Sequence, residues 1–258
     1  MSAAGMEPRT RVTAAEMARP LPAEADPAPC PIVELRQYTL HDEQRDTLID
    51  LFERQFIEPQ EALGMKVIGT FRDLDRPNFF VWLRGFTDMD SRVSGLTDFY
   101  GGEVWKTHRE TANATMLDSD NVLLLRAPDM AAAFKASPAR PALGEYLPAG
   151  LIVATIFYFD SQADRAAALF NEKVKPELEK SGTPVLAWFA TETAPNNYPR
   201  LPVREGEKAL VWFTRFEDAA AHVRHSARLA DAQSALLPLS ARSPEELRLA
   251  PTARSELR

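Results

Sequence analysis

The sequence has little of what builds disulfide, metal or membrane proteins: one cysteine, four histidines and no long apolar run. Cys30 cannot form an intrachain disulfide, and we expect its thiol to be exposed. The histidines, at positions 41, 108, 222 and 225, have no metal-ligand spacing, so we expect no metal site. No stretch approaches the roughly 20 apolar residues of a membrane-spanning helix, and we expect no membrane partner.

Common nucleotide-binding and hydrolase motifs are also missing. The sequence contains no G-x-G-x-x-G, Walker loop, G-x-S-x-G or H-E-x-x-H pattern, so neither nucleotide binding nor a hydrolytic triad is indicated. The net charge of -7 gives an acidic surface that repels phosphate backbones, which argues against a nucleic-acid partner.

The first thirty residues are rich in Ala, Pro and Glu and show no apolar periodicity. This composition predicts a disordered leader over 1–30. It lacks the apolar segment of a signal peptide, and its acidic residues disfavour a targeting peptide. We therefore expect a cytoplasmic protein.

The remainder of the chain repeats itself. "LFERQFIEPQEALGMKVIGTF" at 51–71 resembles "LFNEKVKPELEKSGTPVLAWF" at 169–189, and "VWLRGF" at 81–86 resembles "VWFTRF" at 211–216. The spacing between the two segments is longer in the second copy, where "APNNYPRLPVREGE" predicts a long loop. The chain is thus expected to consist of two copies of one unit.

Within a copy, alternating and helical apolar patterns predict the order β-α-β-β-α-β. In the first copy "IVELRQYTL" alternates as a strand, and a helix follows that ends at Gly64. A strand pair around "DRPN", a helical region over 88–116 and the strand "NVLLLR" complete it. This predicts an α+β protein of two tandem ferredoxin-like units: a first unit over 31–128, a linker over 129–149 and a second, diverged unit over 150–258. Two bare sheet faces can then pair sheet to sheet.

Four segments together resemble the NIPSNAP family: "VELRQYTL", "EPQEALGMKVIGTFRDL", "FVWLRGF" and "FYGGEVWKTHRETANATMLDSDNVLLL". The resemblance is close over 32–126 and weaker over 150–251. It implies a dimeric α+β barrel, here with both units in one chain. Related barrels include cofactor-free monooxygenases, polyketide cyclases and haem enzymes, although a shared fold does not fix a function.

Strand periodicity gathers one set of candidate residues. The period of two places Glu34, Arg36 and Tyr38 on one face of the first strand, and Trp82 and Arg84 on one face of the third. If the aliphatic faces receive the helices, these side chains point between the two sheets and outline a small-molecule site. The alternative is an ion network of Glu34, Arg36 and Arg84 that only fixes how the sheets pair.

The stretch from Phe99 to Ala127 supplies a second set: Tyr100, Trp105, His108, Arg109 and Asn113. Trp105 is sufficiently explained by helix packing on the sheet. His108 and Arg109 on the same helix face must hydrogen-bond or reach water, because an unpaired buried charge is costly. The alternatives here are an ion pair of Arg109 with an acidic residue of "LDSDN", and a capping role for Asn113. The second copy has no matching stretch, which favours a specialised role for the first.

Two functions remain open. One is an enzyme that binds or transforms a small aromatic or polyketide-like molecule by cofactor-free acid/base or monooxygenase-type chemistry. In it His108 is the acid or base, Tyr38 a proton donor and Arg36 a stabiliser of an anion, while Arg84, Trp82, Tyr100, Trp105, Arg109, Asn113 and Glu34 bind the substrate. No cofactor is expected, with haem on His108 as the lesser alternative. The other function is a non-catalytic binding or assembly protein, and a homo-oligomer is compatible with either.

Overall fold

The computed structural model describes residues 29–135, 140–144 and 148–258. All but the last two residues of the expected leader over 1–30, and parts of the expected linker over 129–149, lie outside these ranges. No helix in the described ranges is both long and apolar enough to cross a bilayer.

The first half has the predicted order, with each helical region broken in two. Its elements are β1 Ile32–Leu40, α1 Arg45–Gln55, α2 Ile57–Glu61, β2 Lys66–Asp73, β3 Phe79–Phe86, α3 Met89–Gly101, α4 Glu103–Ala114, β4 Met116–Asp118 and β5 Val122–Arg126. The second break falls at Gly102, whose backbone is extended. A Cβ atom at this position would lie 2.9 Å from the carbonyl oxygen of Asp98, too close for a side chain. Gly64 follows α2 at φ 78°, as expected for the residue after a helix.

The second half repeats this order. Its elements are β6 Leu151–Tyr158, α5 Ala163–Leu169, the π-helical turn η1 Phe170–Val174, α6 Lys175–Lys180, β7 Val185–Thr191, β8 Ala209–Phe216, α7 Ala219–Gln233, the 3-10 turn η2 Ser234–Leu239 and β9 Glu245–Pro251. The predicted loop between the second and third strands is present as the connection 192–208, where the first half has only 74–78.

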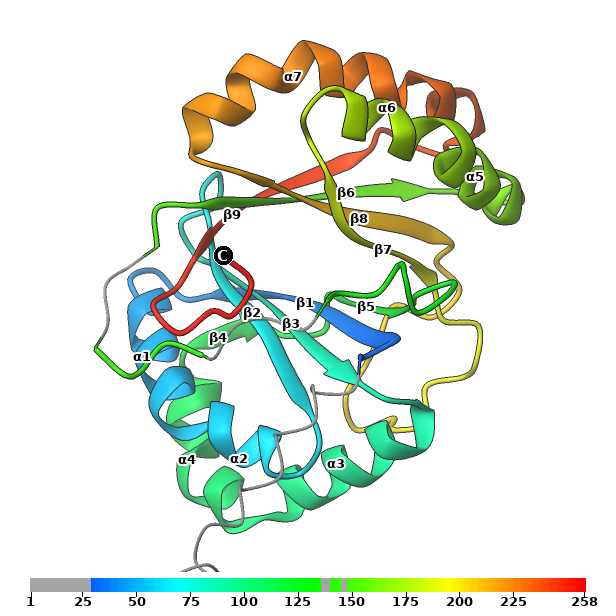
Figure 1. The fold of residues 1–258 in the computed structure, drawn as a ribbon. Coiled ribbons are helices and arrows are strands. Elements are labelled where there is room, and N and C mark those ends of the chain that lie inside the picture. Colours follow the sequence, from blue (N-terminus) through cyan, green and yellow to red (C-terminus); the bar gives the residue numbers. More distant parts are fainter. Residues whose placement is uncertain (1–28, 136–139, 145–147) are drawn as a thin grey trace, which may run out of the picture.

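The strands of both halves form one closed sheet (Figure 1). Their order is β3-β2-β9-β6-β8-β7-β5-β1, and the pairing of β1 with β3 closes an antiparallel barrel, to which β4 adds at the end of β1. The halves join where β2 pairs with β9 and where β5 pairs with β7. Helices α1–α4 cover the first half from outside and α5–α7 cover the second, so the predicted fold class is confirmed.

Apolar side chains fill the barrel. Val33 and Leu35 of β1 and Val81 and Leu83 of β3 belong to one fully buried cluster with the strands of the second half. The aliphatic faces of these strands therefore meet across the barrel. The aliphatic rows of β1 and β3 thus pack against the second half, and Gln37, which follows them on the same face of β1, is also buried and accepts from Arg76 at 3.2 Å.

Cys30 differs from expectation. Its thiol is half-buried because the residue packs against Gly85 of β3, where an added methyl group would collide with it. Burial raises the pKa of the thiol to about 11. The expectation of an exposed cysteine was wrong, since residues 29 and 30 already lead into β1.

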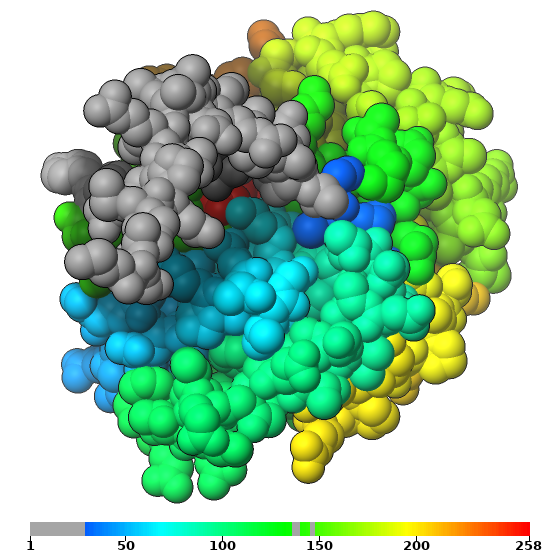
Figure 2. All heavy atoms as spheres, turned by 60° about the horizontal axis from the view of Figure 1, so that its bottom comes forward, coloured from blue at the N-terminus to red at the C-terminus, as the bar shows by residue number. Residues whose placement is uncertain are grey.

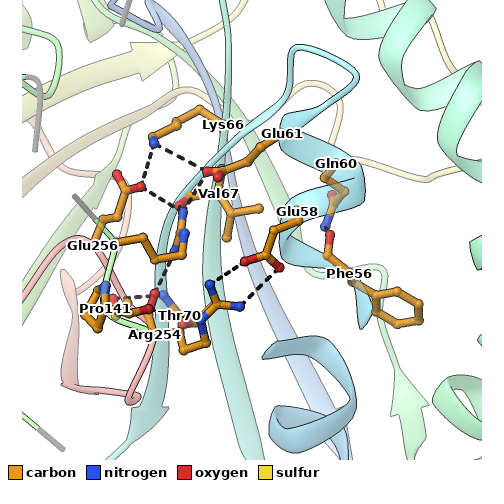
Figure 3. Close-up of polar contacts among 12 residues, drawn as sticks. Phe56, Glu58, Gln60, Glu61, Lys66, Val67, Thr70, Pro141, Arg254 and Glu256 are labelled. Atoms are coloured by element: carbon orange, nitrogen blue, oxygen red, sulfur yellow. Dashed lines mark hydrogen bonds and ion pairs between the residues drawn. The ribbon is translucent and has the colours of Figure 1, made fainter. Parts of the chain in front are cut away.

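The C-terminal segment 252–258 returns to the first half and anchors α1 and α2 (Figure 3). Arg254 donates from Nη1 to the carbonyl oxygen of Glu53, at 2.8 Å, and to the Glu58 carboxylate, at 3.1 Å. Glu256 forms ion pairs with Lys66, at 2.5 Å, and with Arg140, at 3.0 Å. The position of α2 thus depends on a segment that follows the last strand of the second half.

Replacement of Arg254 by alanine is expected to lower the free energy of unfolding by about 1–3 kcal/mol, because buried acceptors lose a charged donor. Urea unfolding measures this. Arg54→Ala is the control: Arg54 pairs with Asp50 on the exposed side of α1, where such pairs contribute less than about 1 kcal/mol. Equal effects of the two substitutions would contradict the anchoring role.

Candidate functional site

The polar and aromatic residues of β1 and β3 share a face, as the strand period predicts: Glu34, Arg36, Tyr38, Trp82 and Arg84. That face is turned to the helices. Arg84 donates from Nη1 to Gln60 of α2 at 3.0 Å, and the rings of Phe52 in α1 and Trp82 lie 4.7 Å apart. The prediction that these side chains point between the sheets was therefore wrong, because the aliphatic face occupies the barrel instead.

Glu34 is the centre of a buried ionic cluster. Its Oε2 accepts from Arg36 at 2.9 Å and from Arg84 at 2.6 Å, and its Oε1 accepts from Nε of Arg92 in α3 at 2.8 Å. None of these four side chains is more than 1% exposed. Burial disfavours the carboxylate, but the guanidinium groups of Arg84, Arg36 and Arg92 outweigh burial and hold the pKa of Glu34 far below its usual value.

The cluster carries more positive than negative charge. Three guanidinium groups surround one carboxylate, and each of them also donates to a neutral acceptor. Arg36 donates from Nε to the hydroxyl oxygen of Tyr38 at 2.9 Å, and Arg84 donates to Gln60. A buried excess of positive charge favours an anion, or negative charge that develops during a reaction, nearby.

A pocket lies beside this cluster, between the sheet and the helices. Its volume is about 30 Å³, room for roughly two water molecules. The lining is mainly aromatic: Tyr38, Leu48, Phe52, Phe56, Gln60, Trp82, Phe99, Tyr100, Trp105, Ala112 and Met116. Tyr100 and Trp105, which come from either side of the α3–α4 break, are half-buried and close the outer side with their rings 4.8 Å apart.

The structure brings most of the predicted residues to this place. Tyr38, Trp82, Tyr100 and Trp105 line the pocket, and Glu34, Arg36 and Arg84 lie in the adjoining cluster.

The other three residues belong to α4 and do not line the pocket. His108 is half-buried with its ring centroid 6.2 Å from that of Phe56, whereas Arg109 and Asn113 are exposed. The expected roles of these three residues in substrate binding or catalysis have no support from their positions.

Sequence reasoning missed two members of the cluster, Arg92 and Gln60. Arg92 carried a usable signal, because it lies four residues before Leu96 and seven before Phe99, on the buried face of α3. An arginine on such a face requires a buried acid, and Glu34 is that acid. Gln60 had no comparable signal.

The second half has no equivalent of this site. The strand registers align Ile32 with Leu151 and Phe86 with Phe216, since these residues occupy the same pairing positions, and Asp88 and Asp218 cap equivalent helices. The residues at the positions of Glu34, Arg36, Tyr38, Trp82, Arg84 and Arg92 are Val153, Thr155, Phe157, Trp212, Thr214 and His222. Only the tryptophan is kept, so the charged cluster is a property of the first half alone.

The residues of the pocket do not fit a haem. His108, the expected axial ligand, is not in the lining, and a volume of about 30 Å³ is far below what a macrocycle occupies. No group of three or more metal-ligating side chains occurs within the described residues.

Comparisons with known proteins agree with the fold. No family model matches the chain, and no curated protein matches it. Among solved structures, a candidate monooxygenase from Fusobacterium nucleatum is 12% identical, with a TM-score of 0.56 over 87% of this chain and 93% of that one. An anthrone oxidase-like protein is also 12% identical, with a TM-score of 0.54 over 86% of this chain and 91% of that one.

A NIPSNAP-like domain protein from Burkholderia xenovorans is 24% identical over 44% of this chain and 94% of its own, with a TM-score of 0.35. The fold assignment rests on the two longer matches, which extend over both halves. The chain therefore has the fold of the dimeric α+β barrels, with both units supplied by one polypeptide.

Proposed function

We propose that the first half binds and transforms a small aromatic or polyketide-like molecule in the pocket between its sheet and helices, by cofactor-free acid/base or monooxygenase-type chemistry. One observation carries this proposal: Tyr38 lines an aromatic pocket, and its hydroxyl accepts from Arg36, which belongs to a buried cluster with excess positive charge. This combination pairs a proton donor with a site for negative charge.

Tyr38 has the properties of a hydrogen-bond donor to a ligand oxygen. Burial raises the pKa of its phenol, although the Arg36 guanidinium opposes this, so the hydroxyl keeps its proton at neutral pH. Since its oxygen already accepts from Arg36, its proton is available to a carbonyl or enolate oxygen. Trp82 lines the same pocket, and its buried indole N–H has no acceptor among the described residues. It is a second donor for such an oxygen.

A ligand with several rings needs more room than the pocket offers. Tyr100 and Trp105 form its outer wall, and Gly101 and Gly102 lie between the two helices that carry them. Outward rotation of the Trp105 side chain widens the pocket without breaking the buried ion pairs of Glu34. The rings of Tyr100 and Trp105 can then pack against the ligand.

Anthrone is a suitable assay substrate, because it has the required ring system and a weakly acidic methylene group opposite a carbonyl. Loss of a methylene proton to water moves negative charge to the oxygen, where Tyr38 and Arg36 can hold it. Dioxygen then oxidises the enolate, and overall one anthrone and one O₂ give one anthraquinone and one water. Oxygen uptake and anthraquinone absorbance follow the reaction.

Tyr38→Phe is expected to lower the rate of this oxidation about 100-fold, as loss of a positioned proton donor typically does. Tyr158→Phe is the matched control. Tyr158 is a buried tyrosine of the second half, hydrogen-bonded to Glu245 and Arg204, and lies outside the pocket.

Binding is measured separately with 2-naphthoate, a fluorescent aromatic anion. A wild-type chain that neither binds 2-naphthoate nor oxidises anthrone would contradict the proposal and favour the alternative of a non-catalytic barrel. Binding without oxidation would support the ligand class and refute this reaction.

A further inference from the structure

The connection 192–208 belongs to the second half in sequence but lies against the first half. It runs beside α3 in the ribbon and in the space-filling view, where it is coloured yellow (Figures 1 and 2). It is fastened to β5 by two backbone hydrogen bonds of 2.9 Å, from Glu192 N to Leu124 O and from Arg204 N to Val122 O. The corresponding connection of the first half, 74–78, is far shorter.

Hydrogen bonds within the connection fix its shape. Asn196 donates from Nδ2 to the Leu201 carbonyl at 2.9 Å and from its backbone N to Glu205 at 2.9 Å. Its Oδ1 accepts from the backbone N of Tyr198 at 3.1 Å. The turn that carries residues 196–198 is thus held by the connection itself, so these residues are presented to α3 in a defined geometry.

This turn holds the outer side of Arg92. The Arg92 Nη1 donates to Oδ1 of Asn197 at 2.7 Å and to Oδ1 of Asn196 at 3.1 Å, while Nε donates to Glu34. Asn197 also donates from Nδ2 to the Met89 carbonyl, in the first turn of α3. The guanidinium is therefore fixed between the Glu34 carboxylate on one side and the second half on the other.

The next residue of the turn extends the aromatic wall of the pocket. Tyr198 is only 7% exposed, and its ring stacks on that of Tyr100 with centroids 6.2 Å apart and planes at 28°. Tyr100 in turn lines the pocket. Tyr198 therefore supports the pocket wall from behind.

We propose that Asn197 and Tyr198 are positioning residues of the site in the first half: Asn197 keeps Arg92 on Glu34, and Tyr198 keeps Tyr100 against the pocket. The second half, which has neither Glu nor Arg at the equivalent positions, thus serves as the support that completes the site of its partner unit. The effect on ligands rests on the function proposed above, whereas the effect on Arg92 and α3 does not.

The consequences for ligands differ between the two residues. Without Asn197, only the longer contact with Asn196 holds the outer side of Arg92, so the guanidinium is less firmly placed in the cluster and binding of an anion weakens more than binding of a neutral ring. Without the Tyr198 ring, the wall loses packing for any aromatic ligand, charged or neutral.

The experiment combines hydrogen exchange with two matched probes, 2-naphthoate and the neutral 2-naphthylmethanol. Asn197→Ala is expected to speed amide exchange in residues 89–95 and to raise the Kd of 2-naphthoate about 10-fold, with less than about 2-fold change for the neutral probe. Tyr198→Ala should weaken both probes and Tyr198→Phe should restore both. Arg200→Ala, an exposed change in the same connection, is the control and should alter neither measurement.

Two results would overturn the proposal. One is amide exchange in α3 at the wild-type rate in the Asn197→Ala variant, which would show that the contact does not hold this helix. The other is wild-type affinity for both probes despite faster exchange, which would reduce the contact to structural support. Failure of the wild type both to bind either probe and to oxidise anthrone refutes the proposed function instead, and the exchange data still decide whether Asn197 holds α3.

Discussion

Glu34→Gln is expected to lower the free energy of unfolding by about 3–5 kcal/mol at pH 7, because it leaves three buried guanidinium groups without a counter-charge. The amide is nearly the same size and can still accept hydrogen bonds, so the loss is electrostatic rather than steric. Urea unfolding gives the value. Glu177→Gln removes an exposed pair with Lys180 and is expected to cost less than about 1 kcal/mol.

The pH dependence identifies the cause. The native state holds the pKa of Glu34 far below its ordinary value of 4.5, so the carboxylate stabilises the fold above pH 4.5 and this stabilisation is lost as the pH falls toward the lowered pKa. The stability difference between wild type and Glu34→Gln should therefore be constant from pH 7 to about 5 and shrink below about 4.5. A difference that does not shrink at all between pH 4.5 and pH 2 would point to packing instead of charge.

The duplication was the part of the fold that could be predicted most directly. Two copies of a β-α-β-β-α-β pattern leave two sheet faces to be covered, and "VWLRGF" and "VWFTRF" do form equivalent strands, β3 and β8. Their equivalent aromatic rings make equivalent contacts: Trp82 lies 4.7 Å from Phe52, and Trp212 lies 4.9 Å from Phe170. Local periodicity and comparison of the sequence with itself were enough to predict the two units, because the core packing is repeated in both halves.

The strand period gave the right sets of residues but the wrong faces. Val33 with Leu35 and Glu34 with Arg36 alternate correctly on β1, yet alternation alone does not say which set meets the helices. All of these residues are buried, so hydropathy could not decide either. Arg92 could have shown which set of β1 residues meets the helices, because a buried arginine on a helix must find an acid on the sheet face that this helix covers.

Only part of the structure of the stretch from Phe99 to Met116 could be predicted from the sequence. A helical wheel places Trp105, His108 and Arg109 together, and all three do belong to α4, yet Trp105 lines the pocket whereas Arg109 is exposed. Asn197 could not be found from sequence at all. Its contact with Arg92 joins residues far apart in the chain through a loop that has no counterpart in the first half.

The second half suggests how the whole cluster can be removed without loss of the fold. At equivalent positions it carries neutral or weakly basic residues around the same tryptophan, and Leu178 stands where the first half has Gln60. A variant that copies this arrangement replaces every partner at once: Glu34→Val, Arg36→Thr, Gln60→Leu, Arg84→Thr and Arg92→His. No buried guanidinium is then left without a counter-charge.

The free energy of unfolding of this five-residue variant is expected to lie within about 2 kcal/mol of that of the wild type and above that of Glu34→Gln. The reason is that replacement of a buried ionic network by matched neutral residues is often neutral or stabilising. Its affinity for 2-naphthoate should fall at least about 10-fold, because the positive charge beside Tyr38 is gone. Urea unfolding and fluorescence titration test the two expectations on one preparation. If the variant is less stable than Glu34→Gln, the ionic cluster is needed for folding itself. If it is stable but binds 2-naphthoate as the wild type does, the cluster does not recognise the anion and the pocket is not the site.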